Sequence, residues 1–188
     1  MGLFRVPFTV RVADIDEAMD PQKPPYEEVA RVSRLKAEAV PRNEEDVVIA
    51  ADTIVVCGGQ VLGKPRDEED ALRMLTLLSG RDHQVMTGLT VLRGSRAAVC
   101  TEVTDIHFRP LTQKEILTYI RTGEPMDKTG VPIGYLGNWR DKAGGYGIQE
   151  TFGALAISRI EGDYYNVVGL PVSRLYQILK DLGVIEDR

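Results

Sequence analysis

The chain has 188 residues, of which 43% are apolar and 27% charged, so it is long enough to bury a hydrophobic core and has the composition of a globular protein. Its formal net charge of −5 comes from acidic and basic residues mixed along the chain, which argues against nucleic acid or an anionic membrane as a partner. Since no apolar run has the length of a signal peptide or a membrane span, we expect a cytoplasmic protein.

The first third of the chain is expected to form a strand, a helix and a buried strand. Residues 5–12 alternate between polar and β-prone types, which predicts a strand almost at the first residue. Residues 26–40 have apolar side chains near helical spacing and predict a helix that carries Lys36. The β-branched run at 47–56, closed by Gly58 and Gly59, predicts a buried strand that contains Asp52 and Thr53.

The middle of the chain predicts two helices and a hairpin. Asp67 is placed to cap a helix over residues 68–78. Residues 84–92 and 97–108 are typical of two strands joined by a turn at 93–96. Thr112 and Glu115 have the spacing of a capping box for a helix that reaches about residue 119. The segment 123–147 is rich in glycine and predicts an irregular loop.

The last third predicts a strand at 154–160, a short segment at 164–168 and a final helix opened by Pro171. Leu175, Ile178, Leu179 and Leu182 form the expected inward face of this helix. Strands interspersed with helices, some parallel and some joined by hairpins, indicate an α/β fold with a mixed sheet in one domain spanning residues 1–188.

Asp52 is the residue that most invites a functional explanation. A carboxylate within an apolar strand faces a desolvation cost unless a cation, a proton or a hydrogen-bond donor satisfies it, so Asp52 could bind a metal or act as a base. The structural alternative is a carboxylate bonded to backbone amides at a strand end. Lys64 follows a short hairpin that returns it toward Asp52, where it could meet a phosphate, although a lysine beside a proline turn is commonly just solvated.

The cysteines and histidines do not suggest a disulfide framework or a zinc site. Cys57 and Cys100 each sit in an apolar run and are expected to be buried free thiols. His83 and His107 are the only histidines, and no Cys/His spacing typical of zinc accompanies them.

Five segments together resemble the Maf family of nucleoside triphosphate pyrophosphatases, in the family's order and over nearly the whole chain. These segments are ADTIVV at 51–56, LGKP at 62–65, LLSGRDHQV at 77–85, GYGIQ at 145–149 and NVVGLP at 166–171. The resemblance implies an elongated, two-lobed α/β fold with a central cleft, related to the inosine triphosphate pyrophosphatases. It also implies cleavage of a nucleoside triphosphate to the monophosphate and pyrophosphate, and a homodimer.

The resemblance implies roles for individual residues as well. Asp52 would be the general base, a metal ligand or both, and Glu17 would help to hold a divalent metal, Mg²⁺ or Mn²⁺. Lys36 and Lys64 would neutralise phosphate oxygens. Two further residues, Thr53 and Gln149, would read the pyrimidine edge and are typical of the branch that acts on dTTP and UTP rather than on 7-methyl-GTP.

Two departures from the family pattern leave alternatives open. Family members normally begin with a segment of the form S-x-S-P-R-R, and we expect this chain to start beyond it. We also expect an inserted loop at about residues 129–142, where Asp127-Lys128 and Asp141-Lys142 look like a small duplication. The competing hypotheses are a noncatalytic nucleotide-binding or septum-related regulatory protein and a nonfunctional fragment.

Overall fold

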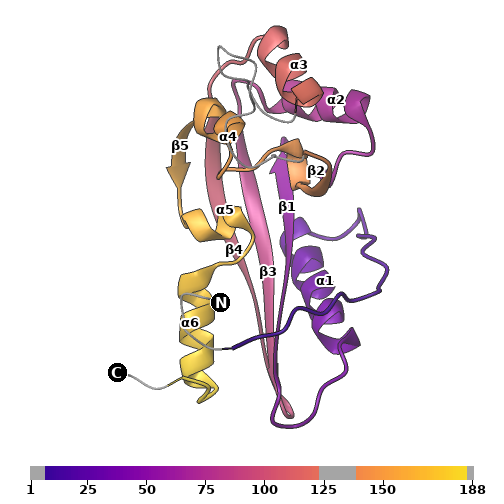
Figure 1. Ribbon diagram of the computed structural model, residues 1–188, viewed down its shortest axis with the longest axis vertical. Helices are drawn as coiled ribbons and strands as arrows, with labels where there is room; N and C mark the ends of the chain where they lie inside the picture. The colour runs from indigo at the N-terminus through magenta and orange to yellow at the C-terminus, as the bar shows by residue number, and fades with distance from the viewer. Residues whose placement is uncertain (1–6, 123–138, 186–188) are drawn as a thin grey trace.

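The computed structural model describes residues 7–122 and 139–185, which form an elongated molecule around one five-stranded sheet (Figure 1). In spatial order the strands are β2 (Gln60–Leu62), β1 (Val47–Cys57), β3 (Asp82–Arg93), β4 (Arg96–Phe108) and β5 (Ile157–Glu161). All neighbouring pairs among these strands are antiparallel. The predicted α/β class is therefore confirmed, but the parallel pairs expected within it are not found among the described strands.

Short turns explain the antiparallel pairing. Gly58 and Gly59 have φ values of +56° and +81° and join β1 to β2, as a two-residue hairpin turn requires. The turn at Gly94 and Ser95 joins β3 to β4, and the two strands stay in register from Arg93 opposite Arg96 to Asp82 opposite His107. The hairpin predicted from the sequence is therefore confirmed.

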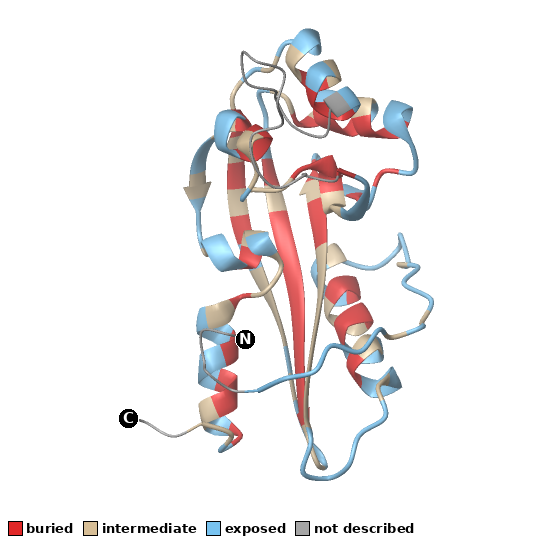
Figure 2. Cartoon of the chain, in the orientation of Figure 1, coloured by how far each residue is buried: buried red, intermediate tan, exposed pale blue. Residues whose placement is uncertain are grey.

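Two helices cover opposite faces of the sheet in the lower half of the molecule (Figure 1). Helix α1 (Pro25–Ala39) packs Val29 against Ile54 and Met86. Helix α6 (Val172–Asp181) packs Leu175 and its neighbours on the other face, against Leu89. Figure 2 shows that β3 is buried along most of its length. This central strand is buried because α1 packs against one of its faces and α6 against the other.

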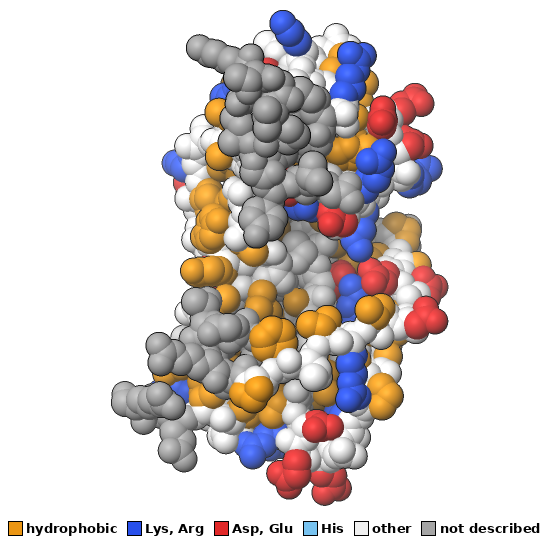
Figure 3. All heavy atoms as spheres, viewed as in Figure 1, with side chains coloured by type: hydrophobic (Ala, Val, Ile, Leu, Met, Phe, Trp, Pro, Cys, Tyr) orange, Lys and Arg blue, Asp and Glu red, His pale blue; other side chains and the backbone are white. Residues whose placement is uncertain are grey.

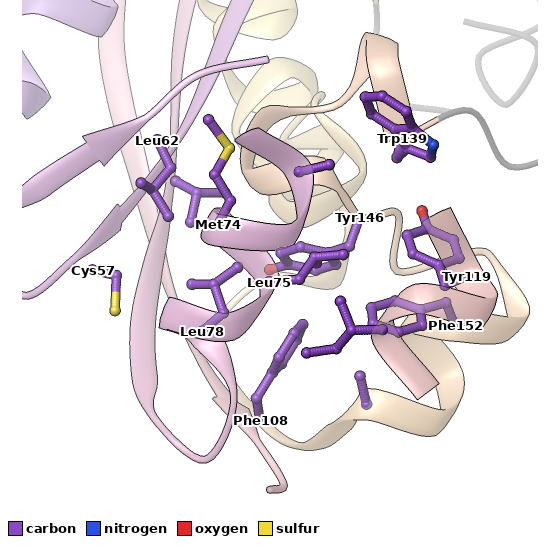
Figure 4. Close-up of a cluster of buried hydrophobic side chains, with 14 of the residues drawn as sticks. Cys57, Leu62, Met74, Leu75, Leu78, Phe108, Tyr119, Trp139, Tyr146 and Phe152 are labelled. Carbon is purple, nitrogen blue, oxygen red and sulfur yellow. The ribbon is translucent and has the colours of Figure 1, made fainter. Parts of the chain in front are cut away.

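A second core lies in the upper half, where α2 (Glu68–Leu78), α3 (Gln113–Thr122) and α4 (Thr151–Ala156) pack on the other end of the sheet. Aromatic side chains from separate segments meet there (Figure 4). Tyr119 and Phe152 stack with their ring centroids 4.0 Å apart, and the Trp139 indole donates to the Ile120 carbonyl at 3.1 Å. These contacts tie α3 to α4 and to the segment at Trp139 that precedes α4.

Both predicted helix caps are confirmed. The Asp67 carboxylate accepts a hydrogen bond from the Asp70 amide at 2.8 Å at the start of α2. At α3 the Thr112 hydroxyl accepts from the Glu115 amide at 3.2 Å, and the Glu115 carboxylate accepts from the Thr112 amide at 2.7 Å. Helix α3 continues three residues beyond its predicted end at residue 119.

The strand predicted at residues 5–12 is wrong over 7–12, the part that the structure describes, because these residues have no regular secondary structure. Val10 and Val12 are 84% and 94% exposed. Alternation of residue types indicates which face of a strand would be buried, but it does not supply the neighbouring strand that a ladder requires.

The strand predicted at 154–160 begins too early, because residues 151–156 form α4 and β5 starts at Ile157. Phe152 and Ala156 lie four residues apart and are both buried, which is the spacing of a helix face. The segment at 164–168 is also helical and forms α5 (Tyr164–Val168). Of the predicted irregular loop, residues 139–147 are described and contain two short 3₁₀ turns, η2 (Trp139–Asp141) and η3 (Ala143–Gly145).

Across residues 7–122 and 139–185, no helix combines the length and the apolar character that crossing a lipid bilayer would need.

Candidate active site

A cleft of about 870 Å³ opens beside strand β1, between the sheet and the segment from Asp141 to Thr151. Its walls include all five residues predicted to bind substrate or to act on it, namely Lys36, Asp52, Thr53, Lys64 and Gln149. Figure 3 shows acidic and basic side chains side by side at mid-height of the molecule. The structure therefore brings together residues that are up to 113 positions apart in the sequence.

The cleft reaches around the free edge of β1. Successive strand residues point to opposite faces, so Asp52 turns toward α1 and Thr53 toward α5. Strand β2 pairs only with residues 55–57 of β1, so on the side of β1 away from β3 no described strand pairs with Asp52 or Thr53. One ligand in the cleft can therefore meet a charged group from one face of the sheet and a neutral hydroxyl from the other.

Asp52, Lys36 and Glu17 form a charged cluster on the α1 side. The Lys36 ammonium lies 2.7 Å from Asp52 Oδ1 and 3.0 Å from Glu17 Oε1. The Asp52 side chain is 10% exposed and that of Lys36 is 19% exposed, whereas Glu17 is 46% exposed. The two predicted carboxylates thus meet at one cation, and Asp52 is satisfied by a lysine rather than by the backbone amides of the structural alternative.

Burial and charge act in opposite directions on this pair. Burial raises the pKa of the Asp52 carboxyl above its ordinary value, although Lys36 pulls it down. Burial alone would lower the pKa of Lys36, but its hydrogen bonds to Asp52 and Glu17 raise it. The lysine therefore keeps its charge at neutral pH, and the aspartate is a stronger base than a solvated carboxylate.

Lys64 enters the cleft from the segment that follows β2. The β1–β2 hairpin brings this segment back along β1, as the sequence predicted, and the positive charge of Lys64 lowers the pKa of Asp52. The Gly63 carbonyl accepts a hydrogen bond from the Gly144 amide at 3.0 Å. This bond connects the lysine-bearing hairpin to the segment that forms the opposite wall.

Thr53 begins a chain of hydrogen bonds on the α5 side. Its hydroxyl lies 2.9 Å from that of Thr87, the residue directly opposite on β3. The Thr87 hydroxyl donates to the Asn166 carbonyl at 3.0 Å. The Asn166 side-chain amide in turn donates to the Val85 carbonyl at 3.0 Å and to the Thr104 hydroxyl at 2.9 Å.

Gln149 lies on a segment that the surrounding side chains hold tightly. The Lys142 ammonium lies 2.7 Å from Glu150 Oε1, and Glu150 also accepts from the Tyr119 hydroxyl at 3.1 Å. A Cβ on Gly147 would come within 2.7 Å of Lys142 Cε and 2.9 Å of the Glu150 carboxyl group. A side chain at position 147 would therefore have to displace this ion pair, which crosses the backbone before Gln149.

A buried histidine supports the same segment from the sheet. The His83 Nε2 atom lies 2.7 Å from the Tyr146 hydroxyl, and both side chains are almost fully buried. Burial lowers the pKa of His83 to about 4, so its ring is neutral at pH 7. His83 therefore contributes a neutral hydrogen bond rather than a charge, and its partner Tyr146 lines the cleft.

Four residues in or near the cleft had no predicted role in the site. Lys142 and Glu150 line the cleft, and Thr87 and Asn166 lie behind Thr53. Thr87 could have been found only by knowing the β1–β3 register, since 34 residues separate it from Thr53. Of the two Asp-Lys pairs in the sequence, Asp141-Lys142 is in the cleft, while Asp127-Lys128 lies outside the described residues.

The chemistry of the cluster fits a divalent cation shared with a phosphate ligand. Mg²⁺ and Mn²⁺ prefer oxygen ligands, and Mg²⁺ commonly takes one or two carboxylates together with substrate phosphates. Asp52 and Glu17 direct carboxylate oxygens at the same small region, because both reach the Lys36 ammonium. Within the described ranges no group of three or more acidic, histidine or cysteine side chains gathers around one point.

The two thiols differ in their exposure. Cys57 is buried, as expected, whereas Cys100 is only partly buried, and both are free. Burial raises the pKa of the Cys100 thiol. Neither cysteine lines the cleft.

The sequence matches the family model described as Maf-like protein over residues 1–132 and 133–182. A dTTP/UTP pyrophosphatase of Syntrophomonas wolfei is 47% identical over 174 residues, which cover 91% of this chain and 84% of the relative. The dTTP/UTP pyrophosphatase of Symbiobacterium thermophilum is 46% identical over 95% of this chain and 84% of its own. That of Aquifex aeolicus is 38% identical over 98% of this chain and 90% of its own.

Proposed function

Because the chain belongs to the Maf family, we propose that it is a nucleoside triphosphate pyrophosphatase that hydrolyses dTTP and UTP to the monophosphate and pyrophosphate. The observation that carries this proposal is the composition of the cleft. A carboxylate, two lysines, a threonine hydroxyl and a carboxamide line one space, contributed by Asp52, Lys36, Lys64, Thr53 and Gln149. Curated relatives over most of the chain have the name dTTP/UTP pyrophosphatase, which favours this activity over the noncatalytic alternative.

Asp52 is the proposed general base. It accepts a proton from a water molecule as the water oxygen bonds to the α-phosphorus, and pyrophosphate departs as the bond from that phosphorus to the bridging oxygen breaks. The raised pKa of Asp52 supports this role, because a base is more effective as its pKa approaches the working pH. Lys36, which hydrogen-bonds to Asp52 at 2.7 Å, orients the carboxylate and remains cationic beside the phosphates.

The charge balance of the cleft supports a divalent cation as cofactor. The described lining contains three lysines, Lys36, Lys64 and Lys142, and three carboxylates, Asp52, Asp141 and Glu150. A triphosphate brings several negative charges that this balanced lining does not offset. We propose that Asp52 and Glu17 hold Mg²⁺ or Mn²⁺, which when bound would neutralise phosphate charge and polarise the reacting phosphorus.

Thr53 and Gln149 are the proposed contacts to the base. Both line the cleft, and a glutamine amide offers a donor and an acceptor to the edge of a pyrimidine. The 7-methyl-GTP branch of the family is the weaker assignment because of these same two residues. Lys64 is the proposed second contact to phosphate.

The remaining proposals concern the context of the enzyme. We propose that residues 1–188 form one Maf-like domain with an inserted loop at about 129–142, most of which lies outside the described residues. The free thiols Cys57 and Cys100 support a reducing, cytoplasmic compartment. By analogy with the family we also propose a homodimer, which light scattering after size-exclusion chromatography would test.

Product analysis tests the proposed reaction. The purified chain should be incubated with dTTP, UTP, CTP or 7-methyl-GTP, with Mg²⁺ or Mn²⁺, and the products followed by ³¹P NMR. We expect pyrophosphate and the monophosphate from dTTP and UTP, with little product from 7-methyl-GTP, and no turnover after chelation of the metal. Release of inorganic phosphate with a diphosphate, or binding of UTP without turnover, would contradict the proposal.

A further inference from the structure

We propose that Thr87 is a positioning residue that determines specificity, because it fixes the direction in which the Thr53 hydroxyl points its hydrogen. The inference rests on the proposed function, in that the cleft is taken to hold a pyrimidine nucleotide. With its hydrogen held by Thr87, the Thr53 hydroxyl can only accept hydrogen bonds from a ligand in the cleft. Such a group suits a base with an N3–H donor, as in uracil and thymine, and disfavours cytosine, whose N3 is an acceptor.

The direction follows from counting donors. A threonine hydroxyl has one hydrogen to donate and lone pairs to accept with, and a carbonyl oxygen can only accept. The Thr87 hydroxyl lies 3.0 Å from the Asn166 carbonyl, so its single hydrogen is used there. In the 2.9 Å contact between Thr53 and Thr87, the hydrogen must therefore come from Thr53.

The Asn166 carbonyl, which accepts the hydrogen bond from Thr87, is itself held in place. Thr87 and Asn166 are both fully buried, so water does not compete for their hydrogen bonds. The Asn166 side chain is anchored to Val85 on β3 and to Thr104 on β4. A hydroxyl whose hydrogen is committed to a buried, anchored acceptor cannot turn to donate to a ligand without losing that bond.

The lone pairs of Thr53 remain accessible from the cleft. Thr53 lines the cleft beside Gly169, whose φ of +105° favours glycine. A Cβ on Gly169 would come within 3.4 Å of Thr53 Oγ1, so the missing side chain keeps the hydroxyl oxygen open. Gln149, on the same cleft, can complement the carbonyl groups that flank N3–H in uracil and thymine.

Thr87→Val tests the inference, because it removes the hydroxyl with little change in side-chain size. The Asn166 carbonyl would still accept from the Gly169 amide at 2.9 Å, so the variant leaves no orphaned acceptor behind. The released Thr53 hydrogen could then be donated to a ligand. We expect the ratio of kcat/KM for UTP to that for CTP to fall about tenfold, the worth of one hydrogen bond.

Thr87→Ser is the matched control, since it keeps the hydroxyl and should preserve the ratio. Thr104→Val perturbs the Asn166 anchor without touching Thr53 and should lower thermal stability more than it changes the ratio. A Thr87→Val variant that turns over UTP and CTP in the wild-type ratio would overturn the inference and leave the proposed function intact.

Two measurements keep the inference testable if that variant does not fold or if the chain has no turnover. With the wild-type protein, N3-methyl-UTP should have at least about tenfold lower kcat/KM than UTP, and equal values would overturn the inference. If the wild type releases no pyrophosphate, the proposed function fails, and equilibrium binding of UTP and CTP becomes the test. Tighter binding of UTP would support the inference, and equal binding would overturn it.

Discussion

The Lys36 ammonium lies 2.7 Å from the Asp52 carboxylate, which joins helix α1 to strand β1 in the lining of the cleft. The same ammonium reaches Glu17, so one cation is shared by two carboxylates on separate segments. Helix α1 can approach this closely because β3 has a glycine, Gly88, opposite Asp52.

Removing the lysine should impair catalysis and change its pH dependence. Lys36→Met leaves Asp52 partly buried without its partner, so the pKa of Asp52 rises further, since Lys36 lowers it in the wild type. We expect kcat/KM for UTP to fall by about 100-fold or more, and the acidic limb of its pH profile to move to higher pH. Arg34→Met is the control, because Arg34 forms only an exposed pair with Glu38. An unmoved acidic limb would contradict the assignment of that limb to Asp52.

The difference in stability between the wild type and an Asp52→Asn variant should change with pH in a defined direction. Because the pKa of Asp52 is raised above 3.8 in the folded protein, its ionisation destabilises the fold as pH rises through the interval between 3.8 and the raised pKa. We therefore expect Asp52→Asn to be at least as stable as the wild type at pH 7, with the two converging below pH 3.8. Chemical denaturation at several pH values measures this difference.

His83 should make the fold sensitive to acid. Its effect on stability is opposite to that of Asp52, because the pKa of His83 is lowered in the folded protein. Burial lowers the pKa of His83 from 6.5 to about 4, so the unfolded chain binds a proton more readily, and stability is lost as pH falls from 6.5 to about 4. The shift corresponds to roughly 3 kcal/mol as an upper figure. His83→Gln should remove this loss between pH 6.5 and 4, as measured by urea unfolding. An unchanged pH dependence in the variant would show that other groups cause it.

Gly88 should not tolerate even a methyl group. A Cβ there would collide with the backbone of Val29 on α1, and neither backbone can move independently. We expect Gly88→Ala to lower the free energy of unfolding by about 1–3 kcal/mol and to impair turnover, because α1 also carries Lys36. Gly63→Ala is the stability control, since nothing lies within 4 Å of a Cβ at that position.

The ion pair that crosses the backbone before Gln149 should matter for substrate affinity. Glu150→Lys breaks the pair with Lys142 and places two positive charges together, so we expect a several-fold increase in KM for UTP. The double variant Lys142→Glu with Glu150→Lys restores an opposite-charge pair and should recover part of the loss. If the double variant is as impaired as the sum of its single changes, the pair does not act by positioning the segment. Arg159→Ala, which breaks an exposed ion pair, serves as the control.

The elements that could be predicted from the sequence are those whose signals are local. The apolar stripe of α6, the two-glycine turn after β1 and the cap at Asp67 each depend on residues within a few positions of one another. The predicted strand at 5–12 failed because a strand needs a partner that the local pattern cannot reveal. The start of α4 was missed because the burial of Phe152 depends on stacking against Tyr119, a residue on another helix.

The residues of the candidate site that could be predicted from the sequence are mainly those within the family motifs. Asp52, Thr53, Lys64 and Gln149 lie within segments that resemble the Maf family, and the structure places all four in one cleft. Thr87, which lies behind Thr53, has no such signal, because its contact depends on strand register and on the packing of α5. Motif residues that line the cleft were thus easier to predict than the buried residue that orients one of them.

The most direct test of the account compares the wild type with Asp52→Asn in pyrophosphate release from UTP with Mg²⁺, after thermal unfolding has shown both proteins to be folded. We predict release by the wild type, and a loss of at least about 100-fold in kcat for the variant with UTP still bound. Turnover by Asp52→Asn at a rate close to that of the wild type would contradict the assignment of Asp52 as the general base.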